Sequence, residues 1–194
     1  MSARDAGRVA ALAVARVVAL PAAALYVVTG RSAGVFRSIM QAAALLPGAL
    51  GSIIRVALLQ WMAKRCAGRV RIEMGTIFSN PRVEIEEHAY IGAFCSIGWA
   101  RIEEYVLLGS GVHVVSGPRV HRFDRTDVPI ALQGGEPKMV RIGRGSWIGN
   151  GAIVMADVGE ECVVGAGAVV TKPIPAWSIA VGVPAKPVAS RRVR

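Results

Sequence analysis

Three histidines, His88, His113 and His121, are the side chains of this 194-residue chain best suited to move a proton near neutral pH. Histidine can act there as a general base without a large pKa shift. His121 opens the run His-Arg-Phe-Asp at residues 121–124 and is the predicted base. His113 is the rival candidate or a substrate contact, whereas His88 follows two glutamates and is expected on the surface.

Charged residues close to His121 are predicted to contact the substrate. These are Arg122, Asp124 and Asp127. A catalytic histidine is commonly held in place by a carboxylate. Asp124, Asp127 and Glu84 are all candidates for that carboxylate, and the sequence does not choose among them.

Around these residues the chain repeats, mostly in steps of six. In fourteen places a large aliphatic or aromatic residue stands two positions after one no larger than valine. One large and one small inward side chain per short strand, followed by a corner, is typical of a parallel β-helix. The large members are Ile72, Phe78, Ile85, Ile91, Ile97, Ile102, Leu108, Val114, Ile142, Ile148, Val154, Val158, Val164 and Val170, and the small ones are Val70, Thr76, Val83, Ala89, Cys95, Ala100, Val106, Val112, Val140, Ser146, Ala152, Ala156, Cys162 and Ala168.

The repeat is interrupted once, over residues 115–141, and this insertion contains His121. A long loop that leaves a regular scaffold is usually functional. Seven glycines directly follow an inner residue, where tight corners are expected to favour a residue free of Cβ strain. Four prolines between residues 173 and 187 are expected to end the strand ladder after Val170.

The formal charge of +10 is unevenly distributed. Residues 1–70 hold nine Lys or Arg and the single acidic Asp5, a net charge of +8. From Arg71 onward fourteen basic residues face twelve acidic ones, a net charge of +2. Because the repeat region is nearly balanced, the charge does not indicate a nucleic-acid partner.

The N-terminal third is also strongly apolar, over Val9–Val28 and Ile39–Ala63. Apolar helices flanked by basic residues are typical of association with anionic membranes. Val9–Val28 is long enough to span a bilayer, yet it is rich in alanine and contains Arg16. An interfacial or shallowly inserted pair of helices is therefore predicted.

A secretory signal is an alternative, because arginines precede an apolar run that ends near residues 22–24. Three free-standing cysteines argue against export to an oxidising compartment. Cys95 and Cys162 occupy small inner positions of the repeat and are expected to pack in the core. Cys66 has no partner at disulfide or metal spacing.

Three regions follow from these patterns. Residues 1–66 are predicted to form two helical segments, 1–38 and 39–66, that bind a membrane, cap the solenoid, or do both. Residues 67–188 are predicted to form the β-helix with its loop at 115–141. Residues 189–194 are expected to be a basic tail.

Three blocks of the repeat region, residues 142–150, 164–172 and 181–186, closely resemble the hexapeptide-repeat acyltransferases. Within that family they look most like the maltose, galactoside and polysaccharide sugar O-acetyltransferases. The resemblance implies a left-handed parallel β-helix and a homotrimer. It also implies acetyl-coenzyme A as acyl donor, bound between neighbouring subunits, and no metal.

The resemblance also implies roles for individual residues. The backbone amide of Asn150 would stabilise the oxyanion of the tetrahedral intermediate. One departure from the family pattern is a coil two residues shorter, at residues 155–161, close to the expected cofactor groove. The coenzyme A contacts would be Trp147 beside its arm, the amides of Ala166 and Gly167 along the pantetheine, and Thr171, Lys172 and Lys186 near the phosphates.

The predicted activity is acetyl-coenzyme A-dependent O-acetylation of a sugar hydroxyl, on a surface polysaccharide or lipid-linked glycan at the cytoplasmic face of the membrane. N-acetylation of an amino sugar uses the same base and groove. A γ-class carbonic anhydrase, another β-helix trimer, binds zinc through three histidines, but the separations of 25 and 8 residues here do not resemble that class. A membrane-tethered trimeric scaffold without activity is a further alternative.

Overall fold

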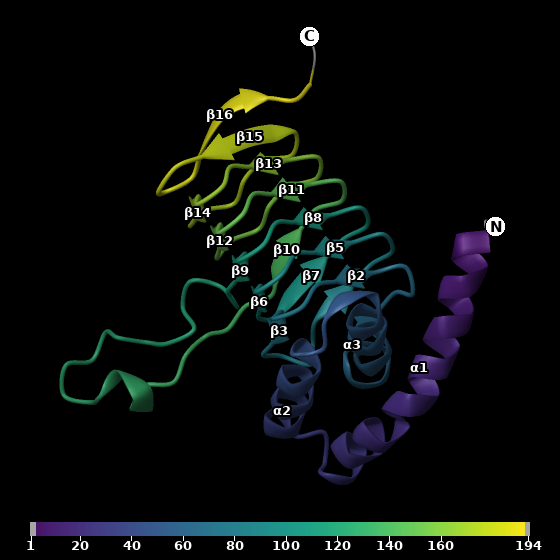
Figure 1. Cartoon of the computed structure of the whole chain (residues 1–194). Coiled ribbons are helices and arrows are strands. Elements are labelled where there is room, and N and C mark those ends of the chain that lie inside the picture. Colours follow the sequence, from purple (N-terminus) through teal and green to yellow (C-terminus); the bar gives the residue numbers. More distant parts are fainter. Residues whose placement is uncertain (1–2, 193–194) are drawn as a thin grey trace.

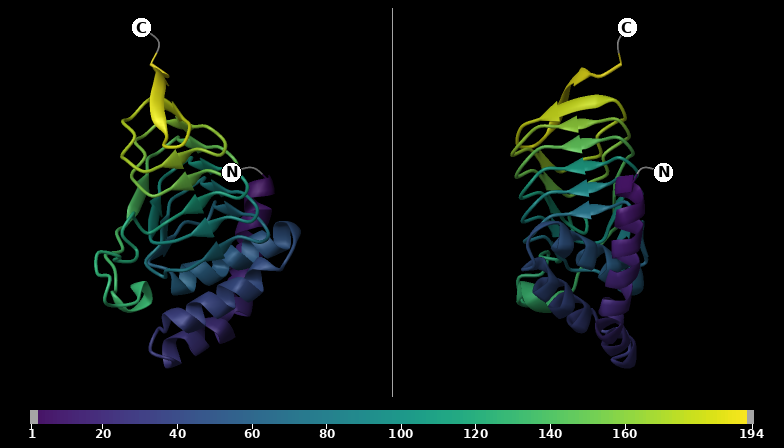
Figure 2. Two further views of the ribbon diagram at one scale, coloured as in Figure 1. Left: turned by 90° about the vertical axis from the view of Figure 1, so that its left-hand side faces the viewer. Right: turned by 45° about the vertical axis from the view of Figure 1, so that its right-hand side comes forward.

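The computed structural model describes residues 3–192. The chain begins with three helices and then winds into a parallel β-helix (Figure 1). The helices gather at the end where the β-helix starts, and the last strands lie at the opposite end (Figure 2). The helices are α1 (Ala3–Val28), α2 (Ala33–Ala44) and α3 (Gly48–Met62).

The first break between helices lies near Gly30, not near residue 38 as the prediction of two helical segments placed it. Gly30 and Arg31 both adopt positive φ, 67° and 58°, which ends α1 and starts a new direction. The second break falls at Pro47 and Gly48, where Gly48 also has positive φ.

The strands stack into three flat sheets, one for each side of a triangular coil. All neighbouring strands are parallel except β15 and β16. Sheet A contains β1 (Arg65–Cys66), β4 (Glu84–Ile85), β7 (Ala100–Ile102) and β10 (Val140–Ile142). Sheet B contains β2 (Arg71–Ile72), β5 (Tyr90–Ile91), β8 (Leu107–Leu108), β11 (Trp147–Ile148), β13 (Val163–Val164), β15 (Ser178–Val181) and β16 (Lys186–Ser190). Sheet C contains β3 (Ile77–Phe78), β6 (Ser96–Ile97), β9 (His113–Val114), β12 (Ile153–Val154) and β14 (Val169–Val170).

The core of the β-helix consists of the predicted inner residues. All fourteen large members are buried, and so are thirteen of the fourteen small ones. Large inner residues of paired strands stack on one another from coil to coil, for example Ile72 on Ile91 and Ile91 on Leu108. This confirms the parallel β-helix predicted from the repeat.

Ala156 is the small inner residue that remains half-buried. It lies in the short coil, where Val158 follows Val154 after four residues and forms isolated bridges to Ile142 and Ile174. The shortened corner still keeps Val158 in the core. The missing residues therefore tighten the corner without interrupting the stack.

The β-helix starts earlier than the sequence pattern indicated, at β1. Cys66 pairs with Ile85 and so takes an inner place in sheet A. Cysteine is smaller than the large inner residues of the other coils, and Lys64 stands where the small inner residue is expected, so the repeat pattern does not reveal this strand. Burial raises the pKa of the Cys66 thiol to about 12. Cys95 and Cys162 are buried in the core as predicted.

The predicted end of the ladder after Val170 is wrong. β15 continues sheet B in parallel with β13, and β16 pairs antiparallel with β15, so residues 189 and 190 of the predicted tail belong to a strand. Pro187 is tolerated because β16 is an edge strand and the pairing is irregular beside it. Residues 193–194 of that tail lie outside the described residues.

The glycines that follow inner residues are required for a different reason from the one predicted. They have no positive φ. A Cβ on Gly149 would instead lie 2.5 Å from the amide nitrogen of Ala166 in the next coil. These glycines let successive coils approach closely, whereas positive φ occurs at the following corner position, as at Gly151 and Gly167.

The open N-terminal end is closed by α3 through the fully buried Arg55. Its Nε and Nη2 donate to the carbonyl of Ile72 in the first coil, at 3.2 and 2.9 Å. Its Nη1 donates to the carbonyls of Ala43 and Leu46 at the end of α2, at 2.9 and 2.8 Å. One side chain therefore joins two helices to the β-helix.

Candidate functional site

The loop between β9 and β10 leaves the wall of the β-helix and runs toward the helical end of the molecule (Figures 1 and 2). Its two arms are joined by backbone hydrogen bonds, from Lys138 to Ser116 (2.8 Å), from Glu136 to Arg119 (2.7 Å) and from Arg122 to Gly134 (2.9 Å). These bonds give an irregular segment a defined shape. Near its tip is a short 3₁₀ helix, η1 (Ile130–Leu132).

His121 lies in a cavity of about 420 Å³ within this loop. Two predicted substrate contacts, Arg122 and Asp124, line the same cavity. Two arginines and two carboxylates therefore face a space next to a histidine, a set that can hold a polar, hydroxyl-rich molecule. The lining residues are Arg119, His121, Arg122, Phe123, Asp124 and Glu136.

The three candidate carboxylates are separated by the structure. Asp124 shares the cavity with His121. Asp127 is paired with Arg125, and hydrogen bonding from that guanidinium lowers the pKa of the Asp127 carboxyl. Glu84 lies on sheet A against Lys64, 2.7 Å away. Neither Asp127 nor Glu84 lines the cavity around His121.

Glu136 is a cavity residue that the sequence did not indicate. It stands on the return arm of the loop, outside any repeat, and only the pairing of the two arms brings it to His121. Its carboxylate pairs with Arg122, which lowers the pKa of Glu136 and raises the pKa of Arg122. No signal in the sequence marks this position.

The other two histidines are elsewhere. His113 is exposed on β9, on the outer face of sheet C, and does not line the cavity of His121. His88 sits at a corner with φ 60° and stacks on the ring of Tyr105, with 4.7 Å between ring centroids. Within residues 3–192, no group of three or more His, Cys, Asp or Glu side chains is arranged to hold a metal.

The residue predicted to stabilise the oxyanion, Asn150, forms the corner after β11. Its side-chain oxygen accepts a hydrogen bond from the amide of Ser110 (3.0 Å), and its carbonyl accepts one from Gly167 (2.9 Å). In the described part of the chain, the amide N–H of Asn150 donates to no acceptor.

The predicted cofactor residues form a row toward the C-terminal end. Trp147 is 53% exposed on sheet B. Ala166 and Gly167 make the next corner above Asn150. Beyond them, the amide of Ala185 donates a hydrogen bond to the carbonyl of Val169 on β14, at 2.8 Å. This bond brings the exposed Lys186 close to β14, and Thr171 and Lys172 directly follow that strand.

The predicted base and the predicted cofactor residues do not meet in one cavity. The space around His121 is lined by loop residues, and none of the cofactor positions contributes to it. The loop projects away from the wall that carries Trp147 (Figure 1). The two predicted halves of the site, which we call half-sites, are therefore separate within one chain.

Comparison with known proteins relates the chain to bacterial transferases. Residues 139–172 match the family described as bacterial transferase hexapeptide (six repeats). A "Probable acetyltransferase" of Mycobacterium tuberculosis is 32% identical over 136 residues, which cover 69% of this chain and 44% of that protein. A protein of Schizosaccharomyces pombe is 39% identical over 101 residues, 51% of this chain and 47% of its own length. The chain thus spans less than half of these two relatives.

Two further relatives cover more of their own length. The dTDP-4-amino-4,6-dideoxy-D-glucose acyltransferase of Escherichia coli is 30% identical over 132 residues, covering 63% of this chain and 69% of that protein. The crystal structure of a maltose O-acetyltransferase from Clostridium difficile 630 superposes with a TM-score of 0.69 over 81% of this chain and 87% of that one, at 21% identity, and so supports the fold. The matched repeat, the fold and the relative from E. coli lead to one conclusion: the chain belongs to the hexapeptide-repeat acyltransferase family.

Proposed function

We propose that this protein transfers an acetyl group from acetyl-coenzyme A to a sugar hydroxyl, with His121 as general base. The observation that carries the proposal is the position of His121, which lines a polar cavity together with Asp124 on a loop of a hexapeptide-repeat β-helix. The names of the relatives, which include acetyltransferases and a sugar acyltransferase, support the reaction class. Complexes of a related N-acyltransferase with coenzyme A support the donor.

The proposed reaction needs no covalent enzyme intermediate. His121 accepts the proton of the acceptor hydroxyl while its oxygen attacks the thioester carbonyl. The oxyanion that forms is stabilised by the amide N–H of Asn150. Collapse of the tetrahedral intermediate breaks the C–S bond, and the coenzyme A thiolate leaves with the proton that His121 had taken.

We assign the orienting carboxylate to Asp124. Glu136 is neutralised by Arg122, and Asp127 by Arg125. Asp124 lines the cavity with His121 and forms no salt bridge among the described residues. An unpaired carboxylate next to the imidazole can fix its orientation and stabilise the imidazolium.

We further propose a homotrimer in which the half-sites of neighbouring subunits combine. The separation of His121 from Trp147 and Lys172 within one chain supports this arrangement. The acetyl group would then lie between the loop of one subunit and the wall of the next. Coenzyme A would follow the corners of Asn150 and Ala166, with its phosphates near Lys172 and Lys186.

The proposed acceptor is a surface polysaccharide or lipid-linked glycan, modified at the cytoplasmic face of the membrane. Three free cysteines in the described chain support a reducing compartment. N-acylation of an amino sugar is a second candidate, favoured by the relative from E. coli that is named for an amino-sugar substrate. The product distinguishes the two, since mild alkali cleaves an ester and leaves an amide intact.

The test is a panel of sugar and amino-sugar acceptors with acetyl-coenzyme A, followed by thiol release and product mass. His121→Ala is expected to lower kcat/KM by about 10²- to 10⁴-fold. His113→Ala is the matched control and is expected to change it far less. Full activity in His121→Ala, or the major loss in His113→Ala, would reject His121 as the base, and no thiol release with any acceptor would reject the reaction.

The shared site is tested by mixing two inactive variants, His121→Ala and Lys172→Glu, during refolding. If each site combines a loop and a wall from different subunits, random assortment in a ring restores roughly a quarter of the wild-type activity. A site contained in one chain would stay inactive in every mixture.

A further inference from the structure

The outer face of α1 is apolar and exposed from Ala6 to Val28. Val14 and Val17 are both 65% exposed, and Val28 is 77% exposed. Between these positions the face carries alanine and proline, without a charged or polar side chain. Large exposed apolar surfaces on a folded protein mark interaction sites. The large side chains of this face are Val9, Val14, Val17, Val18, Leu20, Leu25, Val27 and Val28.

The opposite face of α1 is attached to the protein at several points. Arg16 Nε donates to Gln60 Oε1 at 2.6 Å, and Trp61 Nε1 donates to the Arg16 carbonyl at 3.2 Å. Arg8 donates to the carbonyl of Val70 in the first coil. Ala6–Val28 is long enough and apolar enough to cross a membrane. These bonds instead hold α1 against α3 and the first coil, so Arg8 and Arg16 contact the rest of the protein and the apolar side of the helix faces outward.

The apolar surface continues beyond α1. A groove of about 370 Å³ runs between the three helices, and every residue that lines it is apolar. Next to it, Leu45 and Leu50 are 77% and 69% exposed at the turn from α2 to α3. The apolar surface of α1 therefore extends over this groove to the turn from α2 to α3.

The same layer carries basic charge without acidic charge. Between Asp5 and Glu73 the sequence contains no acidic residue. Arg31, Arg37 and Arg69 form no salt bridge within the described chain. Arg69 borders a cavity of about 270 Å³ together with Arg8 and Arg16 of α1 and with Glu87 from a corner of the β-helix. A second copy of this surface would bring like charges together, whereas anionic lipid complements them.

From these observations we propose that α1 and the α2–α3 turn form a membrane-docking surface. Helix α1 lies parallel to the plane of an anionic bilayer, with its apolar face at the acyl boundary. Arg31, Arg37 and Arg69, which form no salt bridge in the described chain, lie near the headgroups. The loop of residues 115–141 projects toward the same end of the β-helix (Figures 1 and 2). If the proposed function holds, docking places His121 near an acceptor carried on a lipid.

The first test is co-sedimentation of the full-length protein with vesicles of phosphatidylglycerol and phosphatidylcholine. Binding is expected to increase with the phosphatidylglycerol fraction and to weaken with salt. The variant Val17→Glu/Leu25→Glu places two charges on the apolar face and is expected to lower the partition coefficient about tenfold or more. Both positions are exposed, so the fold is retained and is checked by circular dichroism.

Val188→Glu is the matched control, because Val188 is 63% exposed on β16, at the opposite end of the β-helix. It is expected to bind vesicles like the wild type. Absence of wild-type binding at every anionic lipid fraction would overturn the proposal, and so would unchanged binding of the double variant. A double variant that breaks up a larger lipid-free oligomer would assign the face to a second copy.

The second test measures depth. Val17→Trp places a fluorophore at the middle of α1, and quenching by lipids brominated at different depths is read after subtraction of the wild-type signal. Docking parallel to the surface predicts the strongest quenching by shallow bromines. Strongest quenching by bromines at the bilayer centre would show a spanning helix and overturn the interfacial arrangement.

Failure of docking and failure of the proposed activity give different results. On a water-soluble acceptor, Val17→Glu/Leu25→Glu is expected to keep the wild-type kcat/KM, and on a lipid-linked acceptor in vesicles to lose it in step with binding. Equal activity of variant and wild type on the vesicle-borne acceptor would reject the role of docking. Inactivity of both on every acceptor would reject the function and leave vesicle binding to be judged separately.

Discussion

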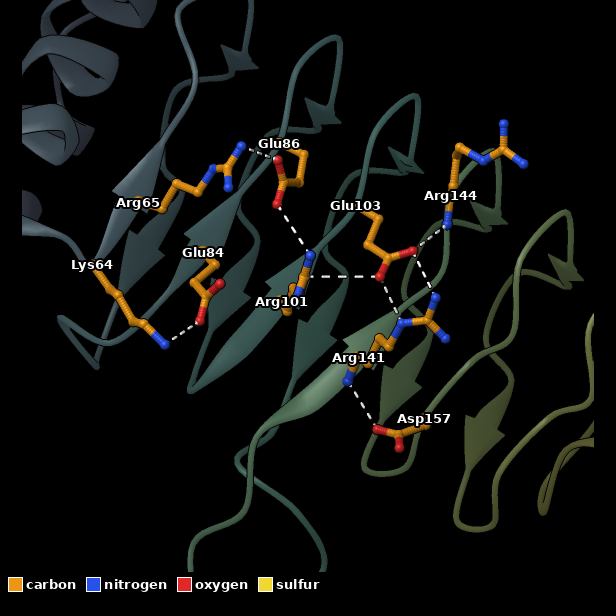
Figure 3. A network of polar contacts seen from close by, with 9 residues as sticks. All are labelled: Lys64, Arg65, Glu84, Glu86, Arg101, Glu103, Arg141, Arg144 and Asp157. Carbon is orange, nitrogen blue, oxygen red and sulfur yellow. Dashed lines mark hydrogen bonds and ion pairs between the residues drawn. The ribbon is translucent and has the colours of Figure 1, made fainter.

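Two surfaces of the molecule are built from arginine–carboxylate pairs, the outer face of sheet A and the loop of residues 115–141. Along sheet A, seven charged residues form one network and Lys64 forms a separate pair with Glu84 (Figure 3). The members of the network are Arg65, Glu86, Arg101, Glu103, Arg141, Arg144 and Asp157. Glu103, whose side chain is 15% exposed, accepts from Arg141 Nε at 2.6 Å and Nη2 at 2.9 Å, and from the Arg144 amide at 3.0 Å. In the loop, Arg122 and Glu136 form a single pair, and both side chains are about half exposed.

The difference comes from the backbone beneath the charges. In sheet A the register places Arg101 directly opposite Arg141, and like charges on neighbouring strands repel. Glu103 bridges the two arginines, and Arg101 continues the network to Glu86. The loop has no such register, so its pairs are local. Charges on the rigid wall contribute to stability, and those on the loop stay accessible to a ligand.

Burial should therefore decide how much each arginine contact contributes to the free energy of unfolding. Arg55 is the most buried of these arginines. Arg55→Leu removes the side-chain donors to the carbonyls of Ile72, Ala43 and Leu46 inside the cap. Of these three, the Ala43 carbonyl keeps a hydrogen bond from the Leu46 amide. We expect a loss of about 3–5 kcal/mol in the free energy of unfolding. Urea unfolding followed by circular dichroism measures it, at fixed protein concentration because an oligomer would link stability to concentration.

Arg55→Lys is the matched variant, since it keeps the charge and can satisfy part of the carbonyl set. Its stability is expected to fall between the wild type and Arg55→Leu. Burial lowers the pKa of Arg55, and Glu73 partly offsets this, so a lysine at this site would also be easier to deprotonate. A melting temperature of Arg55→Leu within about 1 °C of the wild type would contradict the role of burial.

The second prediction concerns Glu103, which is partly buried. Glu103→Gln should lower the free energy of unfolding by about 1–2 kcal/mol at pH 7, because three charge-assisted contacts are weakened. Burial alone would raise the pKa of Glu103, but hydrogen bonds from Arg141 and the Arg144 amide outweigh it and hold the pKa below its ordinary value of 4.5. A lowered pKa stabilises the folded state above pH 4.5, and this stabilisation is lost as the pH falls through the folded-state value.

The difference between wild type and Glu103→Gln should accordingly shrink in acid and in high salt, as measured by thermal unfolding over a pH series. Glu104→Gln is the control, because it makes the same chemical change at the neighbouring residue. Glu104 forms no salt bridge in the described chain. An equal loss in both variants would mean that the network around Glu103 adds nothing specific.

The sequence predicted the β-helix well because its core repeats. Each coil needs one large and one small inward residue, so Ile72 and its equivalents reveal the strands directly. It failed where the structure is not periodic. β1 depends on Cys66, which is too small to complete the pattern, and β16 depends on an antiparallel turn that no repeat encodes.

The candidate site was predicted in part for the same reason. His121 and Asp124 stand close together in the sequence, and they share a cavity. Glu136 enters that cavity from twelve residues beyond Asp124, through hydrogen bonds between the loop arms. The roles of Arg55 and Glu136 both come from long-range contacts, which residue type and spacing cannot show.

The smallest effect on stability is expected at Glu136. The pair with Arg122 is exposed to solvent, so Glu136→Gln should leave the melting temperature within about 1 °C of the wild type. Kinetics should respond instead, because Arg122 lines the cavity and loses the carboxylate that fixes its position. We expect a several-fold rise in the KM for the acceptor, on the order of 1 kcal/mol of binding.

Asp127→Asn separates a cavity effect from a general loss of loop charge. It breaks an equally exposed pair, with Arg125, that does not line the cavity. Neither its melting temperature nor its KM should change. If Glu136→Gln instead lowered the melting temperature as much as Glu103→Gln, the loop would be as much a part of the stable scaffold as sheet A, and the contrast between the two charged surfaces would not hold.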